Sequence, residues 1–300
     1  MNSKTNILTF CVAKDSVGLS LKEILYNEMK LSSRLVRKLK SKKNILVNGN
    51  KIPFHAILRK GDLVQVIMEE EANQFEPEPI SIEVVYDDVD LLIVNKHPGI
   101  VVHPTKGHPT GTMANAIVYY MQEKGEHFKI RFINRLDRDT SGLIMIAKNP
   151  FVQQEISKQM QENKVEKIYV AVVAGKFKEK KGTINAPIGR VEPENIKREV
   201  YEGGQESITH YEVIEEFQDA SLVKIKLETG RTHQIRVHMS YIGHPLIGDE
   251  LYGIENKDFI GRQALHAQSL VFYQPRTNQK ISVNSSIPED MESLIKKLTK

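Results

Sequence analysis

The sequence predicts an α+β protein that carries a small basic domain at its N-terminus. Strand and helix patterns follow each other irregularly between residues 82 and 299, which favours a mixed, mostly antiparallel sheet over a regular β-α-β arrangement. A length of 300 residues is typical of two domains. Positive charge is also concentrated: residues 30–60 contain ten Lys or Arg and no Asp or Glu, whereas residues 61–300 contain 29 basic and 35 acidic residues.

Composition excludes several classes of protein. The single cysteine, Cys11, rules out an internal disulfide framework and a four-thiolate metal site. The apolar stretch at residues 7–13 is too short for a secretory signal. No run approaches the roughly 20 apolar residues that a bilayer span requires. We therefore expect a cytoplasmic protein without a membrane segment.

The basic domain is predicted to cover residues 14–70. Ser32 or Ser33 can cap a helix that ends near residue 41. The Asn48-Gly49 pair indicates a hairpin between residues 45–47 and 51–52. Ten positive charges without one negative charge indicate a polyanionic partner, and we expect RNA. The residues predicted to contact RNA phosphates are Arg34, Arg37, Lys38, Lys42 and Lys43.

An acidic, proline-containing linker is predicted at residues 71–80, followed by the larger domain at residues 81–300. Strands are predicted over residues 82–86, 91–95, 143–147, 167–174, 207–215 and 221–228, with others near 268–273 and 280–285. Helices are predicted over residues 112–123, 150–162, 232–242 and 288–299.

One loop carries an unusual concentration of charge. The segment Arg135-Leu136-Asp137-Arg138-Asp139-Thr140-Ser141-Gly142-Leu143 lies between two apolar stretches, as a catalytic loop mounted on a rigid scaffold does. Asp139 precedes Thr-Ser-Gly and is expected to brace an Asx-type turn, and Gly142 is expected in a turn. Asp137 is then the candidate reactive group. A carboxylate pair of Asp137 and Asp139 would instead suggest a glycosidase.

A second charged segment, residues 227–238, can supply a partner for Asp137. A helix is expected to begin near Thr232, which places Arg236 beside the core. A half-buried arginine needs an acidic partner, so Arg236 either pairs with the reactive carboxylate or forms a purely structural salt bridge. The spacing of His233 and His238 does not suit a zinc site, and no phosphate-binding glycine-rich loop is present. We expect no metal and no cofactor.

Five segments together resemble the motifs of the bacterial RNA pseudouridine synthase family, whose members modify ribosomal and some transfer RNAs. The segments are residues 92–99 with 102–104, 135–143, 167–169, 230–236 and 243–249. The basic segment resembles the small αL RNA-binding domain that is fused to many of these synthases. The resemblance covers about residues 17–285 and implies the pseudouridine synthase fold.

The resemblance also implies roles for individual residues. Asp137 corresponds to the essential aspartate and Arg236 to the arginine that pairs with it. Tyr169 corresponds to the tyrosine that stacks on the target base and helps remove its proton, and Arg135 to the arginine that fills the place of the flipped-out nucleotide. Asn134 stands where most relatives carry His. The implied substrate is structured RNA, with large-subunit ribosomal RNA favoured by the fused basic domain.

Two other classes of function compete with this interpretation. The basic domain alone is compatible with a non-catalytic RNA-binding or ribosome-assembly protein. A hydrolase that uses Asp137 and Asp139 would release free base or sugar. The joint presence of Asp137, Tyr169 and Arg236 favours the synthase over both.

Overall fold

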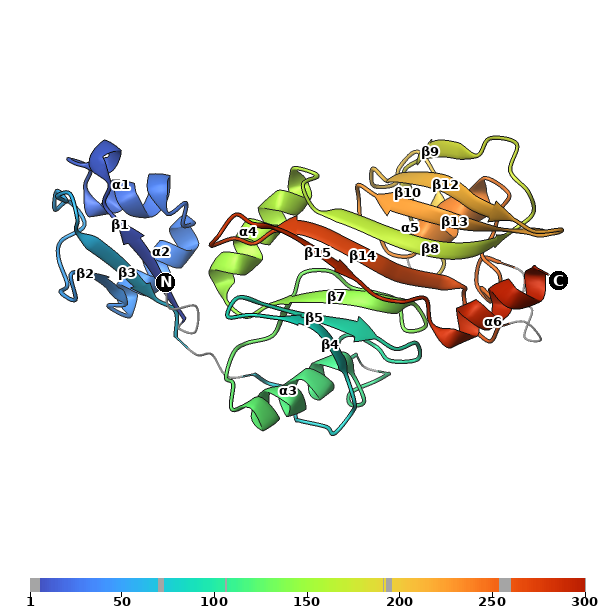
Figure 1. Cartoon of the computed structure of the whole chain (residues 1–300), viewed down its shortest axis with the longest axis horizontal. Helices are drawn as coiled ribbons and strands as arrows, with labels where there is room; N and C mark the ends of the chain where they lie inside the picture. Colours follow the sequence, from blue (N-terminus) through green and yellow to red (C-terminus); the bar gives the residue numbers. More distant parts are fainter. Residues whose placement is uncertain are drawn as a thin grey trace.

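The computed structural model describes residues 6–69, 73–105, 107–190, 192, 196–253 and 260–299. Over these ranges the chain forms a three-stranded N-terminal sheet and a ten-stranded sheet that runs through the rest of the molecule (Figure 1). No helix within the described ranges is both long and apolar enough to cross a membrane.

The N-terminal unit combines a β1-β3-β2 sheet with short helices. Its elements are β1 (Ile7–Cys11), η1 (Lys14–Ser16), α1 (Leu21–Glu23) with its π-helical continuation η2 (Ile24–Glu28), α2 (Ser33–Ser41), β2 (Ile45–Val47) and β3 (Leu63–Ile67). The Ser32 hydroxyl caps α2 by accepting a hydrogen bond from the Leu35 amide at 3.3 Å. Because β1 belongs to this sheet, we propose that the unit begins at β1 rather than at residue 14.

The hairpin predicted after α2 is only partly correct. Asn48 and Gly49 do form a tight turn with positive φ angles of 51° and 79°. The strand that pairs with β2 is β3, however, rather than residues 51–52. Val64 and Val66 of β3 are fully buried. Their burial stabilises the β2–β3 pairing more than residues 51–52 could stabilise a hairpin, because that segment is short and ends at a proline.

The large sheet confirms the predicted α+β architecture with mixed, mostly antiparallel strands. Its main order is β4 (Glu83–Asp87), β5 (Leu91–Lys96), β7 (Ser141–Ala147), β14 (Leu265–Tyr273), β8 (Glu166–Ala174), β13 (Ala220–Leu227), β12 (Ile208–Glu216) and β9 (Lys181–Asn185). In addition, β6 (Arg131–Phe132) pairs with β7, and β15 (Lys280–Asn284) pairs with β14. A separate pair is formed by β10 (Ile188–Gly189) and β11 (Glu199–Val200). β7 and β14 run parallel.

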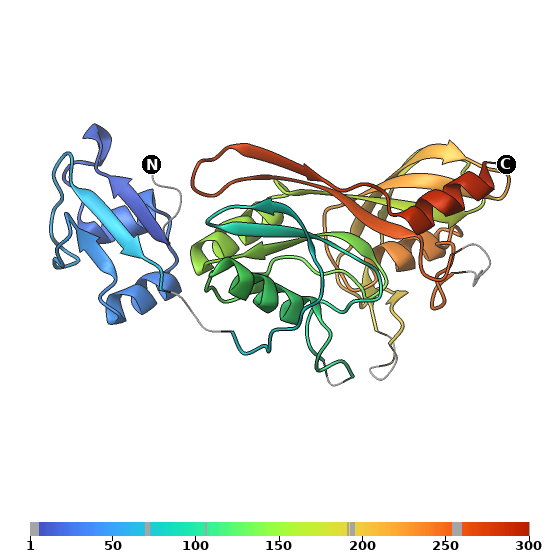
Figure 2. The same cartoon turned by 60° about the horizontal axis from the view of Figure 1, so that its bottom comes forward.

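Helices cover this sheet from different sides (Figures 1 and 2). They are α3 (Met113–Lys124), α4 (Pro150–Gln161), α5 (Gln234–Tyr241) and α6 (Glu289–Leu298). Alternate residues of β5 face opposite ways: Leu92 packs in one core cluster with α3, and Leu91 in another with α4. β7 is buried over its whole length, so the loop that precedes it is attached to a rigid strand.

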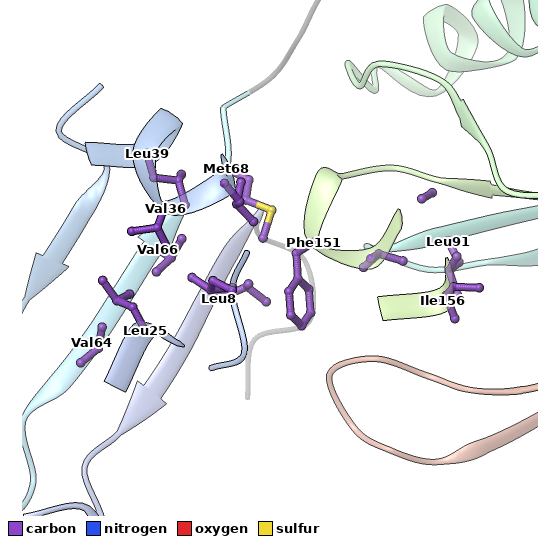
Figure 3. Packing of buried hydrophobic residues seen from close by; sticks show 14 of the residues in the cluster. Leu8, Leu25, Val36, Leu39, Val64, Val66, Met68, Leu91, Phe151 and Ile156 are labelled. Atoms are coloured by element: carbon purple, nitrogen blue, oxygen red, sulfur yellow. The ribbon is translucent and has the colours of Figure 1, made fainter. Parts of the chain in front are cut away.

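The two units meet at α4, where Phe151 lies between the N-terminal core and the large sheet (Figure 3). The Gln154 amide nitrogen donates to the Lys30 carbonyl at 3.0 Å, and its oxygen accepts from the Ser32 amide at 3.1 Å. Arg276 also donates to the Ile7 carbonyl at 2.7 Å. This junction holds helix α2 in a defined position beside α4.

The predicted linker is packed over much of its length. Residues 70–72 lie outside the described residues. Asn73 donates to the Phe128 carbonyl at 2.5 Å and accepts from the Ile130 amide at 2.8 Å, and Phe75 packs against the core that contains α3. The segment from residue 73 onwards therefore belongs structurally to the large unit.

Lys96, at the end of β5, anchors the charged loop. Its ammonium group donates to the carbonyls of His97 at 2.9 Å and Arg138 at 2.7 Å. Only 1% of the residue is exposed. Burial lowers the pKa of Lys96 to about 7, although the charges of Asp139 and Asp137 act in the opposite direction.

The sequence suggested that Gly142 is a turn residue, but it is part of β7. Its φ is +115°, and a Cβ there would lie 2.3 Å from the carbonyl oxygen of Ala267 on β14. The parallel pairing of β7 with β14 therefore needs glycine at this position.

We expect Gly142→Ala to lower the free energy of unfolding by about 3 kcal/mol or more, because strain adds to a backbone clash. Gly125→Ala is the matched control. Gly125 also has a positive φ, of 64°, but a Cβ there would meet no atom within 4 Å, so the loss should be about 1 kcal/mol. Equal losses at the two positions in urea unfolding would contradict the close approach.

Lys96 predicts a pH dependence of stability. In the unfolded chain the pKa of a lysine is about 10.4, whereas in the folded chain the pKa of Lys96 is about 7. Between these values the unfolded state binds more protons, so folding gains stability as pH rises. The free energy of unfolding of the wild type, relative to Lys96→Met, should increase from pH 7 to pH 10. A difference independent of pH in urea unfolding would refute the lowered pKa.

Candidate active site

Asp137 and Arg236 are brought together although 99 positions separate them in the sequence. Arg236 lies in α5, and its Nη1 donates to Oδ2 of Asp137 at 3.0 Å. The Arg236 side chain is 9% exposed and the Asp137 side chain 27% exposed. The Asp137 carboxylate is thus the more accessible member of the pair. The turn that presents it is closed by a hydrogen bond from the Thr140 amide to the Asp137 carbonyl at 3.2 Å.

Asp249 is the second partner of Arg236, and sequence reasoning did not identify it. Nε of Arg236 donates to Oδ2 of Asp249 at 2.6 Å, and Nη2 donates to Oδ1 at 2.8 Å. The amides of Leu251 and Tyr252 also donate to Asp249, at 3.0 and 3.1 Å. Burial opposes the charge of Arg236, but the hydrogen bonds and charges of Asp249 and Asp137 outweigh it and raise the pKa of the guanidinium.

Arg236 therefore combines the two roles that the sequence left open. It forms a buried, bidentate salt bridge with Asp249, and the same guanidinium contacts the exposed carboxylate of Asp137. Bidentate pairing fixes the plane of a guanidinium, so Asp249 determines the direction in which Arg236 meets Asp137. The only sequence signal for Asp249 was its place at the end of the segment 243–249.

Tyr169 lies on β8 and is 7% exposed. It lines a small cavity of about 60 Å³ together with Asp137 and Arg236. Burial and the neighbouring charge of Asp137 raise the pKa of the phenol above its usual range. The hydroxyl therefore stays protonated at neutral pH, and Tyr169 presents an apolar ring with a neutral polar tip.

Arg135 stands at the border between this small cavity and a larger groove. Its side chain is exposed and donates to the Thr232 hydroxyl. The groove has a volume of about 620 Å³, and Arg135, Tyr169 and Arg231 line both spaces. The Arg135 guanidinium thus lies where a molecule in the groove would enter the cavity of Asp137.

His233 is a further member of the site that the sequence suggested only as an unsuitable zinc ligand. It adopts a positive φ of 59° at the start of α5. Its Nε2 lies 3.9 Å from Oδ2 of Asp137, and its Nδ1 is 2.9 Å from the Tyr252 hydroxyl. Burial lowers the pKa of His233 despite the opposing charge of Asp137. Backbone strain at a non-glycine residue is typical of functional sites, but it cannot be read from sequence.

Two neighbours of Asp137 have structural roles. The Asn134 amide donates to the Leu143 carbonyl at 3.1 Å and accepts from the Met145 amide at 2.7 Å, so it pairs with β7 as a backbone group would. The Asx turn predicted at Asp139 is wrong. The Asp139 carboxylate instead accepts hydrogen bonds from the adjacent Arg138 at 2.9 to 3.1 Å, because that side chain can reach it directly.

The predicted phosphate-contacting residues lie on the N-terminal unit, away from this cavity. Arg34, Arg37, Lys38, Lys42 and Lys43 are all exposed. Lys42 forms an ion pair with Glu69, which reduces its availability for other anions. In the part of the chain that the structure describes, no group of three or more His, Cys, Asp or Glu side chains could hold a metal ion.

Comparisons with known proteins identify the family of this chain. Residues 90–241 match the family described as RNA pseudouridylate synthase, and residues 8–64 match the family described as the RluD ribosomal pseudouridine synthase N-terminal domain. The chain is 39% identical over 297 residues to the uncharacterized RNA pseudouridine synthase YhcT of Bacillus subtilis (strain 168), covering 98% of each protein.

Two further similarities extend the comparison. The chain is 34% identical over 305 residues to ribosomal large subunit pseudouridine synthase D of Escherichia coli (strain K12), covering 96% of this chain and 93% of that protein. The solved structure of human RNA pseudouridylate synthase domain containing 1 matches with a TM-score of 0.57 and 30% identity, covering 70% of this chain and 86% of that one. The family resemblance and fold predicted from the motifs are thereby confirmed, and the chain belongs to the RNA pseudouridine synthase family, whose enzymes are isomerases that act on RNA.

Proposed function

We propose that this RNA pseudouridine synthase converts specific uridines of large-subunit ribosomal RNA to pseudouridine, in the cytoplasm, and that Asp137 is its catalytic residue. The observation that carries the assignment of Asp137 is its hydrogen bond with the buried Arg236, at the wall of a cavity that Tyr169 also lines. The similarity to ribosomal large subunit pseudouridine synthase D supports the choice of RNA.

The reaction requires little beyond a positioned carboxylate. The bond between the ribose C1′ and N1 of uracil breaks, the base rotates, and a new bond joins C1′ to C5. C5 then loses its proton, and N1 gains one. Uridine and pseudouridine contain the same atoms, so nothing is added or oxidised. Arg236 donates a hydrogen bond to Asp137 and orients its carboxylate. Asp137 can assist by attack on C1′ or on C6 of uracil, or by removing the ribose 2′ proton.

The target uridine must leave its stack before it can reach Asp137, at a cost of a few kcal/mol. Arg135 lies at the entrance of the cavity, and we propose that it occupies the place of the extruded nucleotide. Tyr169 offers its ring inside the cavity, where stacking on uracil offsets part of that cost. Because its pKa is raised, Tyr169 acts as a neutral phenol and not as a standing phenolate base.

The basic N-terminal unit is proposed to bind RNA at a distance from the chemistry. Arg34 and Arg37 are exposed on α2, and the junction at Gln154 holds that helix in place relative to the large sheet. Affinity from phosphate contacts is independent of sequence. The N-terminal unit therefore supplies binding energy, and the cavity selects the uridine.

Asp137→Asn should lower the rate of pseudouridine formation on a large-subunit ribosomal RNA transcript on the order of 1,000-fold or more, with RNA affinity largely retained. Asp139→Asn is the matched control, because Asp139 is a carboxylate in the same turn that contacts Arg138. It should keep most of the activity when both variants are assayed by chromatographic separation of the digested nucleosides, which distinguishes uridine from its isomer of equal mass. Comparable losses in both variants, together with released uracil, would support the carboxylate-pair hydrolase instead.

Replacing both Arg34 and Arg37 by Gln should weaken binding and reduce the slope of log affinity against log salt by about 2, since each phosphate contact contributes roughly 0.9. Filter binding of the same transcript between about 50 and 300 mM salt measures this slope. Lys42→Gln should change it less, because Lys42 is paired with Glu69. An unchanged slope in the double variant would place the RNA-binding face elsewhere.

A further inference from the structure

A second cavity, of about 400 Å³, lies beside the candidate active site. Its walls come from β10 and the residue after it, from the residues on either side of β11, and from the segment that precedes α5. We call it the arginine cavity, because Arg190, Arg198 and Arg231 line it.

The charge of the arginine cavity is strongly one-sided. Among the described residues that line it are three arginines and no Asp or Glu. Nε of Arg198 is buried and has no hydrogen-bond partner. A buried donor without an acceptor is costly, and more so in a charged group, so the guanidinium of Arg198 keeps hydrogen-bonding capacity that the described residues around it do not satisfy. Arg231 is held by a hydrogen bond from its Nε to the Glu206 carbonyl at 3.0 Å.

Glycines shape the cavity around an aromatic ring. A Cβ at Gly189 would lie 2.4 Å from Cε1 of Tyr201, and a Cβ at Gly203 would lie 2.6 Å from Cε2 of the same ring. At Gly204 a Cβ would lie 2.7 Å from the backbone of Ile188. The ring is thus held tightly between two backbone segments, which makes the cavity a formed space and not a gap between loose side chains.

The arginine cavity is adjacent to the cavity of Asp137 and shares a lining residue with it. Arg231 lines the arginine cavity, the cavity of Asp137 and the large groove. Thr232 lines the arginine cavity and accepts the hydrogen bond of Arg135. A chain molecule that places one unit beside Asp137 would therefore bring its next units to these arginines.

We propose that the arginine cavity binds backbone phosphates of the RNA strand next to the extruded uridine. This inference rests on the proposed function. Arginine is suited to this ligand because its planar fork matches two phosphate oxygens. Extrusion rotates a nucleotide about its own backbone, so the phosphates beside it must be held in a new position for the base to stay in the cavity.

The protein side of the test uses the full-length chain with Arg198→Gln and Arg190→Gln, singly and together. Each change should raise KM for a stem-loop RNA that contains the modified uridine about tenfold, lower kcat less, and reduce the slope of log affinity against log salt by about 0.7. Lys296→Gln is the charge-matched control, since Lys296 is an exposed residue of α6 that lines none of these cavities. Arg198→Lys keeps the positive charge but not the planar guanidinium. It should therefore restore the salt dependence of binding and only part of the affinity.

The RNA side of the test replaces single phosphates next to the target uridine by neutral methylphosphonates. At the contacted position, the neutral linkage should weaken wild-type binding about tenfold and weaken Arg198→Gln no further. Additive losses at every linkage, or equal behaviour of Arg198→Gln and Lys296→Gln, would overturn the arginine cavity as a phosphate site. A wild-type protein that forms no pseudouridine would instead overturn the proposed function.

Discussion

The candidate active site depends on one buried positive charge. Arg236 is 8% exposed and would be costly to bury without compensation. Asp249, which is fully buried, provides that compensation through two hydrogen bonds and leaves one guanidinium nitrogen for Asp137. The carboxylate proposed to be catalytic is therefore oriented by an arginine that a buried salt bridge with Asp249 stabilises. Replacing Asp249 would change the orientation of Asp137 through Arg236, without a change to Asp137 itself.

The loop that carries Asp137 is held by neighbours on three sides. Lys96 of β5 donates to the carbonyl of Arg138, and Arg262 donates to the carbonyl of Asp139 at 3.0 Å. Asn134 extends the ladder of β7 at the beginning of the loop. These contacts are made to backbone atoms or by side chains that do not face the cavity. The rigidity of the site thus comes from residues that have no proposed role in the reaction, as catalytic geometry generally requires.

Charge is distributed according to the part of the RNA that each region is proposed to meet. The N-terminal unit carries the excess of positive residues, on an exposed helix held beside α4. The large unit is nearly neutral in total, with 29 basic and 31 acidic residues from residue 73 onwards, yet it gathers Arg190, Arg198 and Arg231 around a single cavity. A distant basic surface increases affinity for RNA in general, whereas a local cluster next to Asp137 acts only on the strand that enters the site.

Periodicity, capping and charge are local properties, and they were enough to predict most strands and helices of the large unit and the basic helix. The motif resemblance added the pairing of Asp137 with Arg236. Neither revealed Asp249, His233 or the arginine cavity, since these depend on which segments meet in space. The β2–β3 pairing, the position of Gly142 within β7 and the contact of Asp139 with Arg138 differ from expectation for the same reason. Each is decided by burial and packing between segments, whose free energies exceed local turn preferences.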